Sequence, residues 1–171
     1  MGTHYLGQQE TDAAREILLR ACTLDPDNPA PYLALAEATA QAGRYDEVDV
    51  WVTAALENAP ADADIAKAAA RFYLERQLIH VEYPLRAIES AIQLAPDDGE
   101  AQMLLGEFLL MTGDNTGALV ALDAAVNLSP TLEQVTLGRA HYLRGLALQA
   151  TGSHDDAQEA FVRAADLGYW P

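Results

Sequence analysis

The sequence predicts an all-α protein, a right-handed solenoid of about five stacked helical hairpins. Pro26 and Pro60 lie 34 residues apart, and so do Pro96 and Pro130. A fixed period of this length is typical of helical hairpins that stack on one another. Half of the 171 residues are hydrophobic but only 7% are aromatic. This apolar content is mostly Ala and Leu, which favours close helix–helix packing over a β-core.

The period divides the chain into units of a single domain. We place their boundaries at about residues 1–28, 29–62, 63–98, 99–132 and 133–171. In the first unit, Gly2 and Tyr5 precede Ala14, Leu18 and Ala21, which fits a hairpin whose first helix is cut short. The second unit has its turn at 42–45, between two apolar stretches at helical spacing.

The fourth unit shows the pattern most completely. Its first helix carries Leu105, Gly106 and Leu109, and its second helix carries Ala118 and Leu122. Glycine and aspartate at 113–114 separate the two helices, because glycine commonly ends a helix and aspartate commonly begins one. Small residues at positions such as 106 and 145 are expected where the two helices of a hairpin cross.

The third and fifth units depart from the period. Pro60 and Pro96 lie 36 residues apart, and we place the extra residues within Gln77–Tyr83. The second helix of this unit is expected to begin at Pro84, since proline is tolerated in a first turn. In the fifth unit, extra residues within Thr131–Leu137 contain neither glycine nor proline, so they are expected to lengthen the next helix at its start.

The fourth unit resembles the tetratricopeptide repeat, whose pattern is W-x2-L-G-x2-Y, then A-x3-F, then P. Leu105-Gly106, Ala118, Leu122 and Pro130 match it, and the two aromatic places of the first helix are missing. The other units carry the pattern less fully, so the resemblance covers nearly the whole chain. It implies that the first helices of the hairpins line a concave groove in which a peptide binds.

Carried over residue by residue, the resemblance predicts the side chains that face this groove. The predicted groove residues are Leu33, Glu37, Lys67, Arg71, Met103, Glu107, Leu110, Met111, Tyr142, Leu146 and Gln149. The part of the groove near the C-terminus is mostly apolar, and Met and Tyr are adaptable recognition residues. Part of this stripe can instead pack helix against helix, and we expect Leu104 and Leu143 to be more buried than Met103 and Tyr142.

Lys67 and Arg71 form the basic pair of the predicted groove, one helical turn apart. They could bind a carboxylate of a partner. Pairing with Asp64 and Glu75 on the same helix is the favoured interpretation. The Lys, Asn and Arg set with which some family members hold a C-terminal carboxylate is not reproduced, which argues against that type of clamp.

The chain is strongly acidic, with 10 basic and 26 acidic residues and a net charge of −16. Such a surface repels phosphate backbones and anionic lipids, so nucleic acid and membrane surfaces are excluded as partners. A solvated acidic outer face that keeps the protein soluble is the favoured explanation. Attraction for a basic partner is the alternative.

The sequence predicts neither catalysis nor a cofactor or metal. Its four histidines lie in different units without metal-ligand spacing, and no phosphate loop or nucleophile motif is present. His141 and Cys22 are expected to be packed residues. No apolar run approaches the ~20 residues of a membrane span, and no signal peptide is visible. A single cysteine favours the reducing cytoplasm, while the periplasm stays open if a leader was removed.

The predicted function is that of a non-enzymatic scaffold for protein–protein interaction. It would hold a peptide segment with apolar anchors and basic flanks in its groove. The alternative is a module that self-assembles through its ends, because Tyr169-Trp170-Pro171 is not the polar end helix that solenoids usually need.

Overall fold

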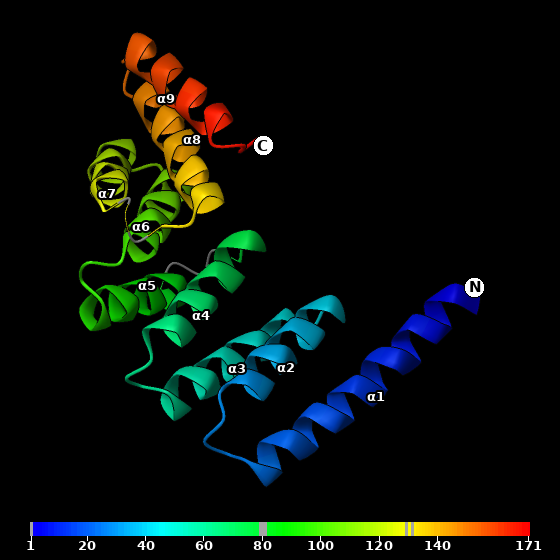
Figure 1. The fold of residues 1–171 in the computed structure, drawn as a ribbon. Helices are drawn as coiled ribbons and strands as arrows, with labels where there is room; N and C mark the ends of the chain where they lie inside the picture. The colour runs from blue at the N-terminus through cyan, green and yellow to red at the C-terminus, as the bar shows by residue number, and fades with distance from the viewer. Residues whose placement is uncertain (1, 79–81, 129, 131) are drawn as a thin grey trace.

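The computed structural model describes residues 2–78, 82–128, 130 and 132–171, with side chains from residue 13 onward. All regular secondary structure of the described residues is helical, and the helices are joined by turns and short connections (Figure 1). They are α1 (Gly2–Leu24), α2 (Ala30–Gln41), α3 (Tyr45–Asn58), α4 (Ala63–Glu75), α5 (Glu82–Leu94), α6 (Gly99–Thr112), α7 (Asn115–Asn127), α8 (Gln134–Ala150) and α9 (His154–Asp166).

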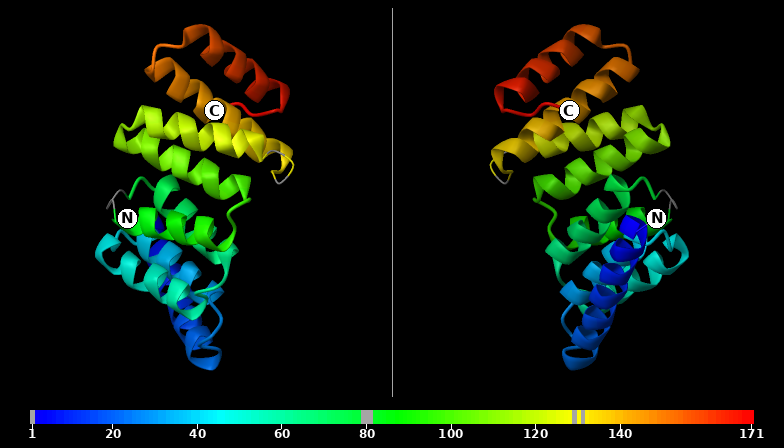
Figure 2. Two further views of the ribbon diagram at one scale, coloured as in Figure 1. Left: turned by 90° about the vertical axis from the view of Figure 1, so that its left-hand side faces the viewer. Right: turned by 90° about the vertical axis from the view of Figure 1, so that its right-hand side faces the viewer.

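The helices from α2 onward pair into antiparallel hairpins, α2 with α3, α4 with α5, α6 with α7 and α8 with α9. The hairpins stack in chain order, so that the first helices α2, α4, α6 and α8 follow one another along the molecule (Figures 1 and 2). This arrangement confirms the predicted all-α solenoid. Its largest cluster of buried side chains extends from α2 to α6 and includes Val52, Ile88 and Leu104. Separate clusters lie between α6 and α8 and between α8 and α9.

Two glycines mark the points where the helices of a hairpin approach most closely. A Cβ added at Gly106 would lie 2.8 Å from Cδ2 of Leu122 and closer still to its Cγ. A Cβ added at Gly145 would lie 2.6 Å from Cδ1 of Phe161. Real Cβ atoms do not approach a neighbour this closely, so the two positions require glycine, as the repeat pattern predicts.

The turn of the α6–α7 hairpin is built as the sequence predicts. Gly113 ends α6 with a left-handed φ of 88°, and the Asp114 carboxylate accepts a hydrogen bond from the backbone N–H of Gly117 at 2.9 Å. The α4–α5 hairpin has no glycine at the corresponding point, and Gln77 adopts the left-handed conformation there with φ 53°. This conformation costs a non-glycine residue about 1–2 kcal/mol.

The first unit differs from the prediction. We expected a hairpin with a shortened first helix, but Gly2–Leu24 is one unbroken helix of 23 residues. No proline interrupts this stretch, and a single interior glycine costs a helix only about 1 kcal/mol. Helix α1 packs against α2, and Arg15 forms an ion pair with Glu47 of α3 at 3.2 Å.

The two departures from the period have different outcomes. Helix α5 begins at Glu82, so the predicted start at Pro84 is two residues late, although Pro84 does lie in the first turn. The extra residues of this unit fall partly at 79–81, outside the described residues. In the fifth unit, α8 has 17 residues against 14 in α6, which confirms the predicted lengthening at its start.

Candidate functional site

The first helices of the hairpins border a series of three hollows. The largest, the central hollow, has a volume of about 530 Å³ and lies among α4, α6 and α8. Its lining residues are Leu74, Glu75, Gln77, Glu107, Leu110, Met111, Arg139, Leu143 and Leu146. The structure therefore brings together four predicted groove residues, Glu107, Leu110, Met111 and Leu146, from two successive hairpins.

A second hollow, of about 370 Å³, lies between α2 and α4, and we call it the N-terminal hollow. It is lined by Leu33, Glu37, Ala68, Arg71, Phe72, Glu75 and Arg76. Arg76 forms an ion pair with Glu37, and its guanidinium lies 4.3 Å from the centre of the Phe72 ring. Glu75 borders both this hollow and the central one, so the two hollows are adjacent.

The third hollow, the polar hollow, contains a saturated cluster of charges. The Lys67 ammonium lies 2.6 Å from Asp98, 3.0 Å from Asp64 and 3.3 Å from Glu100. Arg71 lies 3.4 Å from Glu100. The pairing of Lys67 with Asp64 is confirmed, but Glu75 is not part of the cluster, and the other acids come from the start of α6. Lys67 is only 8% exposed, so it is a structural cation and is not free for a partner.

The pKa values of this cluster follow from its geometry. Burial by itself would lower the pKa of the Lys67 ammonium, but the hydrogen bonds to Asp98, Asp64 and Glu100 outweigh it and raise the pKa above its usual value. Burial would likewise raise the pKa of the Asp98 carboxyl. Lys67 and the backbone N–H groups of Glu100 and Ala101 outweigh that effect, and they hold the pKa below its usual range.

The central hollow combines an apolar lining with acidic groups. Arg139 donates a hydrogen bond to Glu107 at 2.6 Å, which leaves the carboxylate of Glu75 exposed beside them. Burial raises the pKa of Glu107, the nearby charge of Glu75 adds to the rise, and Arg139 opposes it. The hollow therefore carries two acids and one base around leucine and methionine side chains.

The structure corrects one of the predicted groove residues, Met103, and places two others, Tyr142 and Gln149, outside the three hollows. Met103 is only 2% exposed and packs in the core with Leu122 and Ala140. Our expectation that it is more accessible than Leu143 is wrong, since Leu143 is 8% exposed and lines the central hollow. Tyr142 packs its ring against the α9 side of the last hairpin, and Gln149 is exposed but borders none of the three hollows.

Tyr142 is held by aromatic neighbours. Its ring centre lies 5.6 Å from that of Phe161 and 5.5 Å from that of Tyr169. The C-terminal residues fold back along α8, where a Cβ added at Gly138 would lie 2.8 Å from that of Tyr169. The ring of Tyr169 therefore covers the chain's own last hairpin, while Trp170 remains 77% exposed.

Sequence reasoning missed Phe72 and Arg76, which shape the N-terminal hollow. The signal for them was weak. Arg76 follows the last residue of α4 and Phe72 lies one turn before it, so their spacing placed them on one side of the helix. Nothing in the sequence indicated that this side meets Glu37 of the preceding hairpin.

Two classes of site are not found within the described residues. That part of the chain holds no group of three or more His, Cys, Asp and Glu side chains arranged to bind a metal ion. Among the helices that the structure describes, none is long and apolar enough to cross a membrane.

The fold defines a helical-hairpin repeat protein with hollows along its first helices. Tetratricopeptide repeat models match residues 5–72, 85–133 and 138–167. Tetratricopeptide repeat protein 36 of Xenopus tropicalis is 32% identical over 155 residues, covering 86% of this chain and 74% of that protein. The chain belongs to the tetratricopeptide repeat family.

Solved structures share the fold at low sequence identity. MamA residues 41 to the end from Desulfovibrio magneticus RS-1 superpose with a TM-score of 0.70 at 19% identity, covering 96% of this chain and 92% of that one. One chain from the structure of the APC/C hetero-tetramer Cut9–Hcn1 gives a TM-score of 0.69 at 18% identity, covering 97% of this chain but only 32% of that chain.

Proposed function

We propose that the protein is a non-enzymatic scaffold that holds an extended or helical segment of a partner protein along the first helices of its hairpins. Membership of the tetratricopeptide repeat family supports a role in protein interaction. Cut9, which shares the fold, is found in a hetero-tetramer with Hcn1. The observation that carries the proposal is that the N-terminal and central hollows lie next to each other along the first helices, with Glu75 in the lining of both.

The central hollow is the anchor site of this proposal. Leu110, Met111 and Leu146 are only partly buried there and pack on the core beneath them. Apolar side chains in a concave site supply most of the energy of peptide binding, often about 2 kcal/mol or more each. They remain available to a partner because their exposed parts line the hollow, in contrast to Met103.

The charges around the hollow indicate which residues flank the anchor. Arg139 neutralises Glu107, while the exposed Glu75 has no ion pair within the described residues. A basic residue of the partner beside Glu75 would meet an uncompensated carboxylate. We therefore infer a partner segment with an apolar anchor and a lysine or arginine next to it, and the net charge of −16 favours encounter with such a segment.

Selection from a library of random linear peptides tests this function. The wild-type protein should enrich sequences with a large apolar residue next to a lysine or arginine. Leu146→Asn, which places an amide in the central hollow, should weaken the selected peptides by more than about tenfold. Glu75→Gln should reduce the preference for a basic flank and leave the apolar preference unchanged.

Val120→Asn is the matched control, because Val120 is 68% exposed on the second helix α7. Its binding should stay within about twofold of wild type, since rim and outer residues contribute little to affinity. If Leu146→Asn and Val120→Asn lost equal affinity for the peptides, or if only Val120→Asn lost affinity, the central hollow would not be the binding site and the proposal would fail.

Self-assembly through the ends is the second candidate, favoured by one observation. Trp170 at one end of the stack is 77% exposed, and at the other end Ile17 and Leu24 of α1 are 69% and 76% exposed. Large contiguous apolar patches are typical of interaction surfaces, and this candidate requires Trp170 or the pair Ile17 and Leu24 to form one when two copies meet. Tyr169 does not belong to such a surface, since its ring already packs on Tyr142.

A pair of variants separates assembly from capping. Tyr169→Ala should lower the free energy of unfolding by about 1–2 kcal/mol, because it removes a ring from the last hairpin. Trp170→Ser should leave the unfolding free energy unchanged and abolish any concentration-dependent association seen by light scattering. A wild-type protein that stays monomeric at high concentration, or association that survives Trp170→Ser, would count against assembly through this end.

A further inference from the structure

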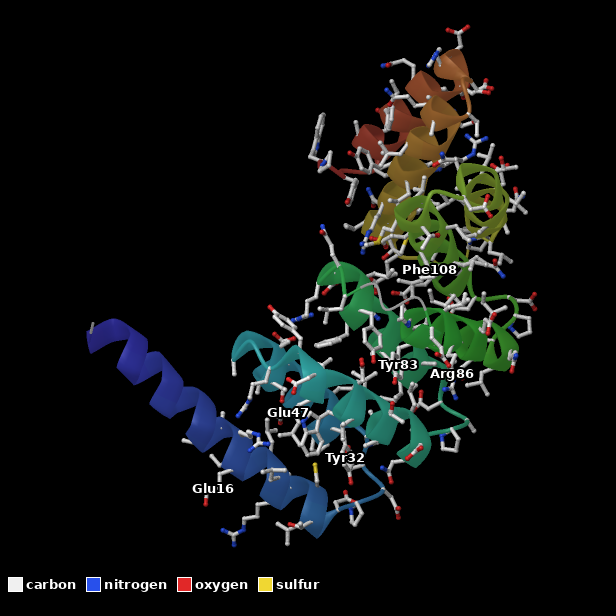
Figure 3. The ribbon with its side chains drawn as sticks, turned by 180° about the vertical axis from the view of Figure 1, so that it is seen from behind. Glu16, Tyr32, Glu47, Tyr83, Arg86 and Phe108 are labelled. Atoms are coloured by element: carbon white, nitrogen blue, oxygen red, sulfur yellow. The ribbon has the colours of Figure 1, made fainter. Side chains whose placement is uncertain are left out.

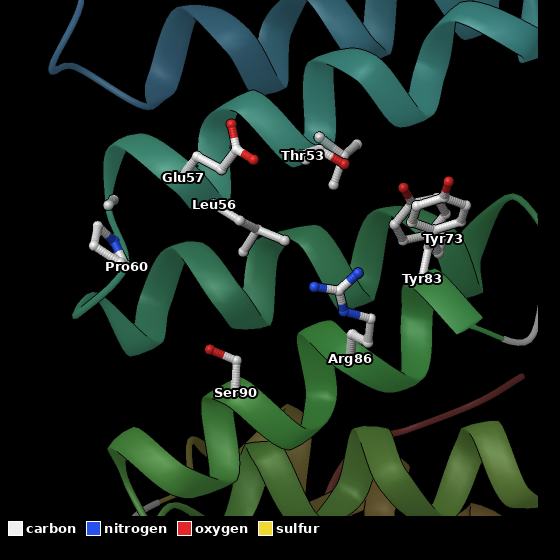
Figure 4. Close-up of a pocket in the computed structure, with 10 residues that line it drawn as sticks. Thr53, Leu56, Glu57, Pro60, Tyr73, Tyr83, Arg86 and Ser90 are labelled. Atoms are coloured by element: carbon white, nitrogen blue, oxygen red, sulfur yellow. The ribbon is translucent and has the colours of Figure 1, made fainter.

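A separate cavity of about 290 Å³ lies between the second helices α3 and α5 (Figure 4). We call it the outer pocket. Its lining residues are Val52, Thr53, Leu56, Glu57, Ala59, Pro60, Tyr73, Tyr83, Arg86 and Ser90. It shares no lining residue with the three hollows along the first helices. Its volume lies at the small end of the range for pockets that hold small molecules.

Arg86 is the cation of this pocket. It lies on α5 near Tyr83 (Figure 3), and its side chain extends toward α3 among Leu56, Thr53 and the two tyrosines (Figure 4). Most cations of this acidic chain are in ion pairs. Those without an acidic partner among the described residues are Arg20, Arg86 and Arg163. Of these three, Arg86 lines the outer pocket, and Arg20 and Arg163 line none of the four cavities described above.

Hydroxyl groups also line the pocket, and Arg86 itself is exposed to solvent. The hydroxyl groups of Thr53, Tyr83 and Ser90 have no hydrogen-bond partner within the described residues. The hydroxyl of Tyr73 differs, because it donates to Asp49 at 2.9 Å. The pocket therefore contains the guanidinium of Arg86 and several hydroxyl groups, all of which can donate hydrogen bonds to a group with several oxygen atoms.

The charge balance selects the kind of anion. A guanidinium binds a planar carboxylate through two parallel hydrogen bonds. One cation cannot balance a phosphate dianion in a chain with a net charge of −16, and the carboxylate of Glu57 on the same pocket would repel it further. With one arginine and one carboxylate in the lining, a monoanion is repelled less than a dianion.

The rest of the lining is apolar and shaped by aromatic rings. Val52 is 1% exposed and Tyr73 is 2% exposed, so both form a fixed floor. The rings of Tyr73 and Tyr83 stack with centres 6.3 Å apart and planes 21° from parallel. Such a wall favours an aromatic or branched aliphatic body attached to the charged group.

We propose that the outer pocket binds a monocarboxylate with an aromatic or aliphatic body, held by Arg86 at its head and by Leu56 and the two stacked tyrosines at its body. The site is independent of the groove and does not depend on the function proposed above. The carboxylate can belong to a free small acid or to the C-terminal residue of a polypeptide, since both present the same chemistry.

Titration followed by amide NMR tests this site with two matched probes. N-acetyl-L-phenylalanine and its amide differ only in the carboxylate. The acid should bind at least about tenfold more tightly than the amide, because hydrogen bonds to a charged group are the stronger ones. Its largest shifts should fall on the amides of Thr53, Tyr83 and Ser90. The peptide Gly-Ser-Gly-Phe, titrated in parallel, identifies the source. Equal or tighter binding of the peptide indicates a C-terminus, and weaker binding a free acid.

Two substitutions of Arg86 and one control complete the test. Arg86→Gln should reduce the affinity for the acid by at least about tenfold and leave the amide unaffected. Arg86→Lys keeps the positive charge but lacks the planar guanidinium. Its affinity for the acid should therefore lie between those of the wild type and of Arg86→Gln. Arg163→Gln removes an arginine on α9 that also has no acidic partner among the described residues, and it should leave the affinity for the acid unchanged. Equal binding of acid and amide, or an equal loss in Arg163→Gln, would show general attraction to charge and overturn the proposal.

Discussion

Gly106→Leu should lower the free energy of unfolding by about 3 kcal/mol or more, at the upper end of what overpacking costs. The Cβ alone would already lie 2.8 Å from Cδ2 of Leu122, a side chain that is fully buried. Because α6 and α7 cross at this point, the two helices must move apart to admit a larger group. Denaturant unfolding followed by circular dichroism measures the change.

A double-mutant cycle removes the ambiguity of a single destabilised variant. Gly106→Ala should destabilise the wild-type protein, since the added methyl group meets Leu122. In a Leu122→Ala background the same change should stabilise, by up to about 1 kcal/mol, because alanine is the better helix former and the space is then open. If Gly106→Ala has the same sign in both backgrounds, the crossing is not where the structure places it.

Lys67→Met should destabilise the protein by about 2–3 kcal/mol at neutral pH, less than the full cost of breaking a buried pair, because Asp98 remains partly hydrated. Lys67 is 8% exposed, and its ammonium is the cation shared by Asp64, Asp98 and Glu100. Its removal leaves Asp64 and Asp98 without a cation, while Glu100 keeps only Arg71 at 3.4 Å. The methionine keeps the volume of the side chain, so the loss reports charge and not packing.

The pKa shifts of Asp98 and Lys67 predict how the destabilisation caused by Lys67→Met changes with pH. The pKa of Asp98 is lowered in the folded protein, so its contribution is present above the ordinary pKa of an aspartate, about 3.9, and is lost as the pH falls through the folded value. The pKa of Lys67 is raised, so its contribution persists through neutral pH and is lost only at strongly basic pH. The difference in the free energy of unfolding between wild type and Lys67→Met should therefore be constant near neutral pH and should shrink below about pH 4. A difference that is unchanged at pH 3 would contradict the charge cluster.

The sequence predicted what depends on the repeat itself. Gly106 and Gly145 lie at the predicted crossings, and Gly113-Asp114 forms the predicted turn, because each of these features is set by contacts within a single hairpin. Helix α1 was not predicted as one helix, since a partial match to the pattern was assigned to a hairpin although nothing in the stretch ends a helix.

The groove was predicted less completely, because a repeat position gives the face of a helix but not how far its neighbours cover it. Met103 is covered by side chains of α8, the helix that is lengthened at its start. Tyr142 is covered by Tyr169, which follows the last repeat and has no place in the pattern. Asp98 as the partner of Lys67 and Arg76 as the partner of Glu37 are contacts between hairpins, which periodicity alone does not determine.

Methyl NMR of the complex tests most directly whether the groove is the binding surface. A peptide selected as above and carrying a spin label beside its apolar anchor would be added to protein labelled at methionine and valine methyl groups. Met111 lies in the central hollow, whereas Val120 points outward from α7. We predict strong broadening of the Met111 signal and none at Val120. Broadening at Val120 with an unaffected Met111 would contradict the account.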